Sequence, residues 1–132
     1  MNLNTFMKNY AQEIDGQYSE YNDTVSIIIV PLFEDRFQTV FGEVTKYDRY
    51  DKEVIEFSSK VCEYEEGIDL KSLMEENHNF CYGKFSILNG YIQVKVTFFK
   101  DNVKESTFKQ AIQEIANLAD EYEFKLTGAD VH

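Results

Sequence analysis

The dipeptide Asn89-Gly90 separates two apolar runs and constrains the fold more strongly than any other local feature of the sequence. A two-residue type I′ turn needs positive φ at both central positions, and Asn followed by Gly adopts these angles at little cost. The turn therefore predicts an antiparallel hairpin between Tyr82–Leu88 and Tyr91–Phe98. In the second run apolar and polar residues alternate, which predicts a sheet with one buried and one solvated face.

Three further runs have the composition of β-strands. Val25–Leu32 is nearly all apolar and β-branched, which predicts a buried strand with Pro31 at its end, where a missing N–H costs least. Phe37–Tyr47 is expected to form the next strand, with Gly42 as a candidate bulge. Val54–Tyr64 is expected to form the third.

Apolar residues at helical spacing predict a first helix at about residues 3–15 and a last helix at Lys104–Lys125. Between the two groups of strands, Asp69 is placed to cap a short helix, Leu70–Asn77. The predicted order is therefore α-β-β-β-α-β-β-α. We expect one α+β domain spanning residues 1–132, with an antiparallel sheet of five strands covered by helices.

Charge and hydropathy exclude several classes of partner. The 24 acidic and 13 basic residues give a formal charge of −11, which opposes binding to nucleic acid phosphates or to anionic lipid. No apolar run approaches the roughly 20 residues of a membrane helix, and the first residues do not resemble a signal peptide. Two cysteines are too few for a disulfide framework. Because neither a signal peptide nor a membrane helix is expected, we expect a cytoplasmic protein.

The residues able to ligate a soft metal ion are few: Cys62, His78, Cys81 and His132. No C-x-x-C pair occurs among them, and a zinc site needs three or four ligands, so no metal is predicted. Cys81 with His78 would be a nucleophile and base in an enzyme, but no third orienting group is evident. No glycine-rich loop precedes a helix, so no cofactor is predicted.

Adjacent carboxylates are the other feature that an enzyme would use. They occur at Glu65-Glu66, Glu75-Glu76 and Asp120-Glu121. A catalytic pair needs a cleft that shifts its pKa, and in a chain this acidic such pairs arise by chance. The sequence therefore favours a protein without catalytic activity.

Packing motifs in the C-terminal half resemble a known family. The matching residues are Leu70, Leu73 and Asn77 in the short helix, Tyr82-Gly83-Lys84-Phe85 at a strand entry, and Ala111, Ile112, Ala116, Ala119 and Asp120 in the last helix. With the element order, they resemble the type III secretion chaperone-like superfamily, and within it the YbjN-like bacterial proteins. The likeness extends over about residues 20–126, and is weak before residue 54.

The resemblance implies a small acidic homodimer that binds a protein or peptide client and performs no catalysis. A sheet with helices on one side leaves strand edges and apolar side chains for a partner to cover. The candidate interface residues are Leu73, Met74, Phe57, Val61, Ile87, Val94 and Val96. The alternative for each of them is burial in the protein's own core.

Three functional hypotheses follow, of which the first is a chaperone-like protein-binding module that acts as a homodimer. The second is an immunity or antitoxin-like protein that neutralises a basic partner, which the charge of −11 motivates. The third and least favoured is a small acid/base enzyme, or one that uses Cys81 with His78.

Overall fold

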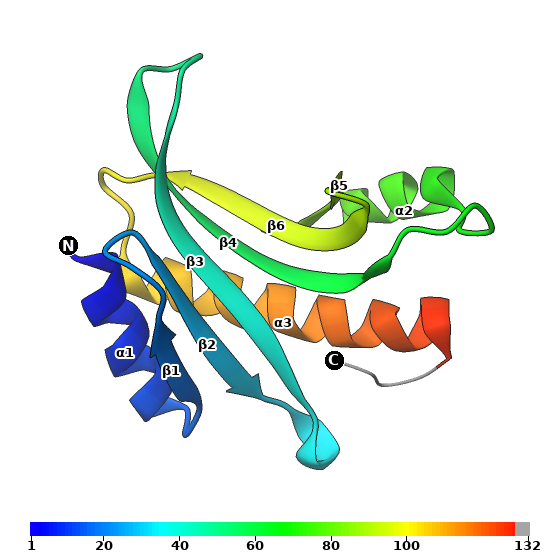
Figure 1. Ribbon diagram of the computed structural model, residues 1–132, viewed down its shortest axis with the longest axis horizontal. Helices are drawn as coiled ribbons and strands as arrows, with labels where there is room; N and C mark the ends of the chain where they lie inside the picture. Colours follow the sequence, from blue (N-terminus) through cyan, green and yellow to red (C-terminus); the bar gives the residue numbers. More distant parts are fainter. Residues whose placement is uncertain (129–132) are drawn as a thin grey trace.

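The computed structural model describes residues 1–128, which form a two-layer α+β fold (Figure 1). In chain order the elements are α1 (Leu3–Glu13), β1 (Gln17–Glu20), β2 (Val25–Pro31), η1 (Phe33–Asp35), β3 (Phe37–Tyr47), β4 (Lys52–Glu63), α2 (Leu70–Glu76), η2 (Asn77–Asn79), β5 (Lys84–Leu88), β6 (Tyr91–Phe99) and α3 (Glu105–Thr127). The predicted fold class, an antiparallel sheet covered by helices, is confirmed.

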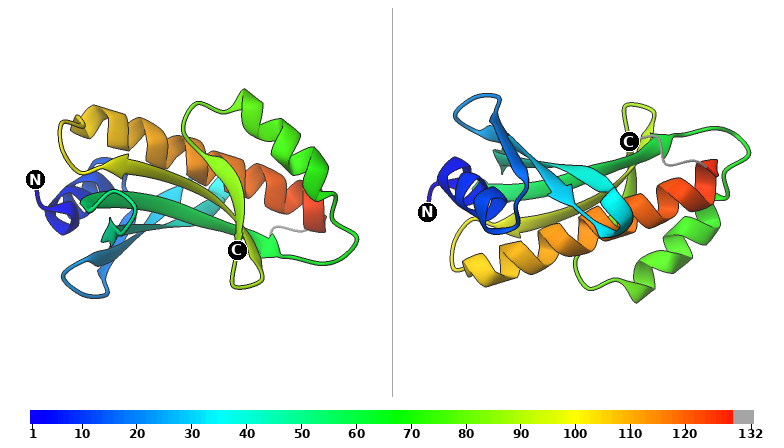
Figure 2. Two further views of the ribbon diagram at one scale, coloured as in Figure 1. Left: turned by 90° about the horizontal axis from the view of Figure 1, so that it is seen from above. Right: turned by 90° about the horizontal axis from the view of Figure 1, so that it is seen from below.

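The strands form one twisted sheet in the order β1-β2-β3-β4-β6-β5, and every neighbouring pair is antiparallel. Helices α2 and α3 lie on the same side of this sheet (Figure 2). Helix α1 packs beside α3, since the rings of Phe6 and Phe108 are 5.6 Å apart. The other face of the sheet, which we call the outward face, is not covered by any of these helices.

The sheet has one strand more than the sequence predicted. Strand β1 pairs with the free edge of β2, from Gln17 opposite Ile29 to Glu20 opposite Ser26. Its sequence is mostly polar and three of its four residues are exposed, so it carries almost no hydrophobic signal. The edge of β2 supplies its hydrogen-bond partners, which is a tertiary effect.

Gly42 does not form the predicted bulge. It pairs in regular register with Ser26 on one side and Phe57 on the other. A Cβ atom at this position would lie 2.7 Å from Cε of Met7 in α1. The glycine therefore makes room for the first helix rather than for a break in the ladder.

The register instead shifts in β4, between Lys60 and Cys62. This bulge places two consecutive side chains, Val61 and Cys62, in buried positions. The Lys60 carbonyl oxygen accepts a hydrogen bond of 2.8 Å from Nε2 of Gln38, a buried side chain of β3. The polar side chain thus satisfies a backbone group at the irregular position.

The predicted hairpin turn, the predicted cap of α2 and the predicted position of Pro31 at a strand end are confirmed. Asn89 and Gly90 have φ values of 53° and 80°, as the predicted hairpin turn requires. The Asp69 side chain accepts a hydrogen bond from the Ser72 N–H and caps α2. Pro31 is the last residue of β2.

The core lies between the inward face of the sheet and the helices. Phe57 of β4 and Phe108 of α3 are fully buried, with ring centroids 5.5 Å apart. Alanines 111, 116 and 119 are buried and bring α3 close to the strands. Within residues 1–128 no helix is long and apolar enough to span a membrane.

Candidate partner-binding surfaces

The structure separates the predicted interface residues into two groups. Buried in the protein's own core are Leu73, Phe57, Val61, Val94 and Val96. They are covered because α1, α2 and α3 all pack on the face toward which these side chains point. Met74 is 69 % exposed and Ile87 is 47 % exposed, so these two remain available to a partner.

Met74 and Ile87 line an apolar groove between α2 and the last two strands. The groove has a volume of about 280 Å³. Its lining consists of Leu70, Leu73, Met74, Asn77, Phe85, Ser86, Ile87 and Ile92. Strand β5 ends the sheet, so within the described part of the chain its outer edge has no strand partner.

A second apolar surface lies on the outward face of β2 and β3. The strand register places Ile27 opposite Phe41, Ile29 opposite Thr39 and Pro31 opposite Phe37, all on the face away from the core. Ile27, Ile29 and Phe41 are half-buried, and Phe37 is 53 % exposed. We call Val25, Ile27, Ile29, Phe37 and Phe41 the outward strip.

The junction between α2 and β5 is held by Glu114 of α3, which sequence reasoning missed. Its carboxylate accepts backbone N–H bonds from Cys81 at 3.0 Å, Tyr82 at 2.8 Å and Gly83 at 2.7 Å. Nothing in the sequence around Glu114 distinguishes it from the other acidic residues of the helix. Only the fold brings it to a loop more than 30 residues away.

The residues that resemble the family motif at this junction have structural roles. Lys84 donates to the carbonyl oxygens of Asn77 at 3.0 Å and Phe80 at 2.6 Å, which closes the end of the α2–η2 segment. The Asn77 side chain accepts a hydrogen bond of 2.7 Å from the Phe85 N–H. These hydrogen bonds therefore fix the connection between the short helix α2 and the edge strand β5.

Three of the four cysteines and histidines lie in the part of the chain that the structure describes. Cys81 is exposed and Cys62 is buried, and neither forms a disulfide. His78 is exposed in η2, and His132 lies outside the described residues. Within residues 1–128 no group of three or more His, Cys, Asp or Glu is arranged to hold a metal ion.

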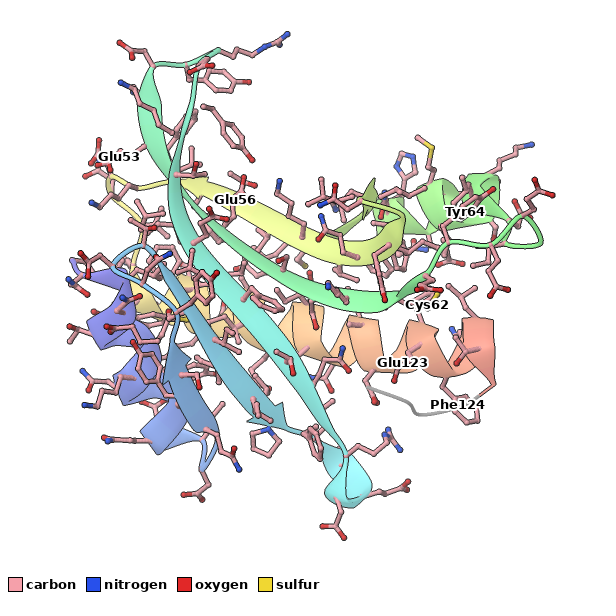
Figure 3. The ribbon with its side chains drawn as sticks, viewed as in Figure 1. Glu53, Glu56, Cys62, Tyr64, Glu123 and Phe124 are labelled. Atoms are coloured by element: carbon pink, nitrogen blue, oxygen red, sulfur yellow. The ribbon has the colours of Figure 1, made fainter. Side chains whose placement is uncertain are left out.

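The pKa of the Cys62 thiol is raised, first by burial and then by the charges of Glu123 and Glu65. Cys62 stands near the end of β4, close to Glu123 of α3 (Figure 3). The thiol is therefore protonated near neutral pH, which is the opposite of what a catalytic nucleophile needs.

One adjacent carboxylate pair is engaged in ion pairs. Asp120 is 7 % exposed and accepts hydrogen bonds from Arg36, with Nε–O and Nη2–O distances of 3.0 and 2.9 Å. Its neighbour Glu121 pairs with Lys125 at 3.0 Å. The ion pair of Arg36 with Asp120 ties the β2–β3 connection to α3.

Two solved structures have a similar fold. A chain of the HopA1–SchA chaperone–effector complex aligns with a TM-score of 0.61 and 10% identity, covering 92% of this chain and 94% of that one. A chain of the ExsC–ExsE complex aligns with a TM-score of 0.54 and 15% identity, covering 96% of each chain. No protein-family model and no curated protein sequence matches. Both likenesses are of fold, and they confirm the α+β fold that the resemblance predicted.

Proposed function

We propose that this chain is a non-catalytic, chaperone-like module that holds an extended segment of a partner protein on the outward face of its sheet. The observation that carries the proposal is the outward strip, which no helix of the described chain covers. The two similar structures are both complexes of two proteins, one of them described as a chaperone with its effector. This supports a role in partner binding.

The geometry of the outward strip suits an extended segment. Side chains on one face of a strand repeat every two residues, so Ile27 and Ile29 present a periodic apolar row. A partner strand with alternating apolar side chains repeats with the same period. Covering this surface contributes about 25 cal/mol for each Å² of apolar area removed from water.

The protein is further proposed to act as a homodimer through the groove between α2 and β5. Met74 and Ile87 are the exposed apolar side chains of that groove. The open edge of β5 lies beside it, and an open edge together with an apolar surface favours self-association. Two copies joined there would present two outward strips to one client. We place this dimer in the cytoplasm, consistent with two free cysteines.

The test uses a fluorescein-labelled peptide of alternating Val and Thr, whose binding is followed by fluorescence anisotropy. The double variant Ile29→Asp/Phe37→Asp should weaken binding at least about ten-fold, since it introduces charges into the apolar contact. Phe124→Asp is the matched control, because Phe124 is 63 % exposed but lies on α3. No binding to the wild-type protein, or equal loss in the control, would contradict the proposal.

A second candidate function, neutralising a basic partner, is favoured by the charge of −11. Such a partner would bind through acidic side chains and would not need the outward strip. Its affinity would fall steeply with salt and would not fall in the Ile29→Asp/Phe37→Asp variant, which adds two negative charges. The same pair of variants therefore separates the two functions when they are applied to a partner isolated from the native cell.

A further inference from the structure

Beyond the outward strip, the outward face of β4 and β6 carries positively charged side chains. On β4, up to the bulge that follows Lys60, the residues that point away from the core have even numbers, because Phe57 points inward against Phe108. Lys52 and Lys60 therefore lie on the outward face, as does Lys95 of β6, which pairs in register with Ser58. A protein of charge −11 thus carries three lysines on one region of its surface. We call Lys52, Lys60 and Lys95 the lysine row.

Each ammonium group of the lysine row lies over an aromatic ring. The distance from Nζ to the ring centroid is 5.5 Å for Lys52 over Phe99, 4.6 Å for Lys60 over Tyr91 and 5.8 Å for Lys95 over Tyr47. Such contacts orient the side chain and leave its positive charge in place. The rings therefore favour positions of the ammonium groups over the sheet face.

Carboxylates neutralise only part of this row. Glu56 is bonded to the Tyr47 hydroxyl and lies 3.2 Å from Nζ of Lys95; Figure 3 marks Glu56 on β4. Lys52 and Lys60 are exposed, and neither belongs to an ion pair found within residues 1–128. Two positive charges therefore remain open to a ligand.

We propose that the partner segment is acidic where it crosses β4 and β6, so that its carboxylates pair with Lys52 and Lys60. This inference rests on the proposed function and adds the chemistry of the client. The two lysines are eight residues apart on one strand, a span of about 26 Å. An extended segment that runs along β4 meets both when its own acidic residues are about eight residues apart.

Charge complementarity favours a peptide over a nucleic acid as the occupant. A phosphate backbone carries a charge at every nucleotide and needs a continuous row of cations. Here Glu56 lies midway between Lys52 and Lys60 in sequence, and the whole chain repels a polyanion. A peptide with two separated carboxylates meets the two lysines and avoids Glu56.

The experiment compares two labelled peptides that share the alternating Val/Thr sequence. One peptide carries two Glu residues eight positions apart, and the other carries Gln at the same positions. At low salt we expect the Glu peptide to bind the wild-type protein about five-fold more tightly. The preference should disappear at about 0.5 M salt, because exposed charges are then screened.

The double variant Lys52→Gln/Lys60→Gln should bind both peptides equally. Its matched control is Lys8→Gln/Lys104→Gln, which changes the net charge equally at exposed lysines on α1 and just before α3. The control should keep the preference. Circular dichroism of both variants checks that the fold is retained.

Several outcomes would overturn the inference. Equal binding of the Glu and Gln peptides to the wild-type protein would reject an acidic client and leave the proposed function intact. Loss of the preference in the control variant would show an effect of net charge alone. Tighter binding of labelled oligothymidylate than of either peptide would identify nucleic acid as the occupant. Failure of both peptides to bind would reject the proposed function, and this inference with it.

Discussion

At the scale of single residues, Glu114 should contribute to the stability of the fold through the junction between α2 and β5. Its carboxylate accepts three backbone N–H bonds at the α2–β5 junction. In Glu114→Ala these donors lose their partner at a partly buried site, so we expect the free energy of unfolding to fall by about 1–3 kcal/mol. Urea denaturation followed by circular dichroism measures the change.

Glu121→Ala is the matched control for this prediction. Glu121 lies on the same helix but is exposed, and it pairs with Lys125 one turn away. Such a surface pair contributes about 0.3–0.5 kcal/mol. If both variants lose the same stability, Glu114 does not anchor the junction.

The two cysteines should differ in reactivity. An aromatic disulfide reagent should label exposed Cys81 at once and buried Cys62 at least about ten-fold more slowly in the folded protein. The raised pKa of Cys62, caused by burial and then by Glu123 and Glu65, lies above the ordinary value of 9.0. Equal labelling rates would show that Cys62 is accessible.

The free energy of unfolding depends on pH because the pKa of the Cys62 thiol differs between the folded and the unfolded protein. As pH rises through about 9 the unfolded thiol loses its proton first, while the folded thiol keeps it, so ionisation favours unfolding. The free energy of unfolding of the wild-type protein should therefore fall toward that of Cys62→Ala between about pH 8 and pH 10. Denaturation of both proteins across this range measures the gap, and a constant gap would contradict the prediction.

At the scale of secondary-structure elements, Gly83 sets how closely β5 approaches α3. A Cβ atom there would lie 2.6 Å from Cγ1 of Val94 and 2.9 Å from Cγ2 of Ile115. Both neighbours are buried β-branched side chains that cannot turn away freely. Gly83→Ala should therefore cost about 1–3 kcal/mol of stability, measured by urea denaturation.

Gly67→Ala offers a control at a loop glycine. No atom lies within 4 Å of a Cβ placed at Gly67. This change should leave stability within about 0.5 kcal/mol of the wild-type value or raise it slightly, because it restricts the unfolded chain. A Gly83→Ala protein as stable as the Gly67→Ala protein would show that β5 shifts without cost.

Sequence patterns predicted those elements that carry their own hydrophobic signal. Phe37–Tyr47 forms a strand with the predicted bounds, and the Asn89-Gly90 hairpin was also predicted correctly. The missed strand β1 forms because β2 offers it an edge. The bulge belongs to Lys60–Cys62 rather than to Gly42, and only the contact of Gly42 with Met7 explains why that residue is glycine.

The surfaces were harder to predict than the strands. An alternating strand shows which residues share a face, but not which face the helices cover. Phe57 and Val94 were candidates for an interface and are fully buried, whereas Met74 and Ile87 are exposed. Glu114 carries no local signal, because its partners lie on a distant loop.

At the scale of the whole molecule, the proposed dimer makes a prediction about mass. Met74→Glu/Ile87→Lys changes the two exposed side chains of the α2–β5 groove. If the groove joins two copies, light scattering should give the mass of a dimer for the wild-type protein and half that mass for the variant. Stability at low protein concentration should change little, because neither side chain is buried in the folded chain.

Phe33→Glu serves as the control for association, since Phe33 is 84 % exposed and lies in η1. The control should remain a dimer. A wild-type protein that is monomeric at all concentrations tested would reject the homodimer and would leave the client-binding proposal to be judged on peptide binding.

The packing of α1 against α3 has a consequence for the order of events during synthesis. Phe6 and Tyr10 emerge from the ribosome among the first residues, yet they contact Phe108 and Gln113 near the end of the chain. Contacts of such large sequence separation form late and slow the folding of a domain. The contacts that join the first helix to the last therefore form only when translation is nearly complete, and premature termination before α3 would leave the inward face of the sheet exposed to aggregation.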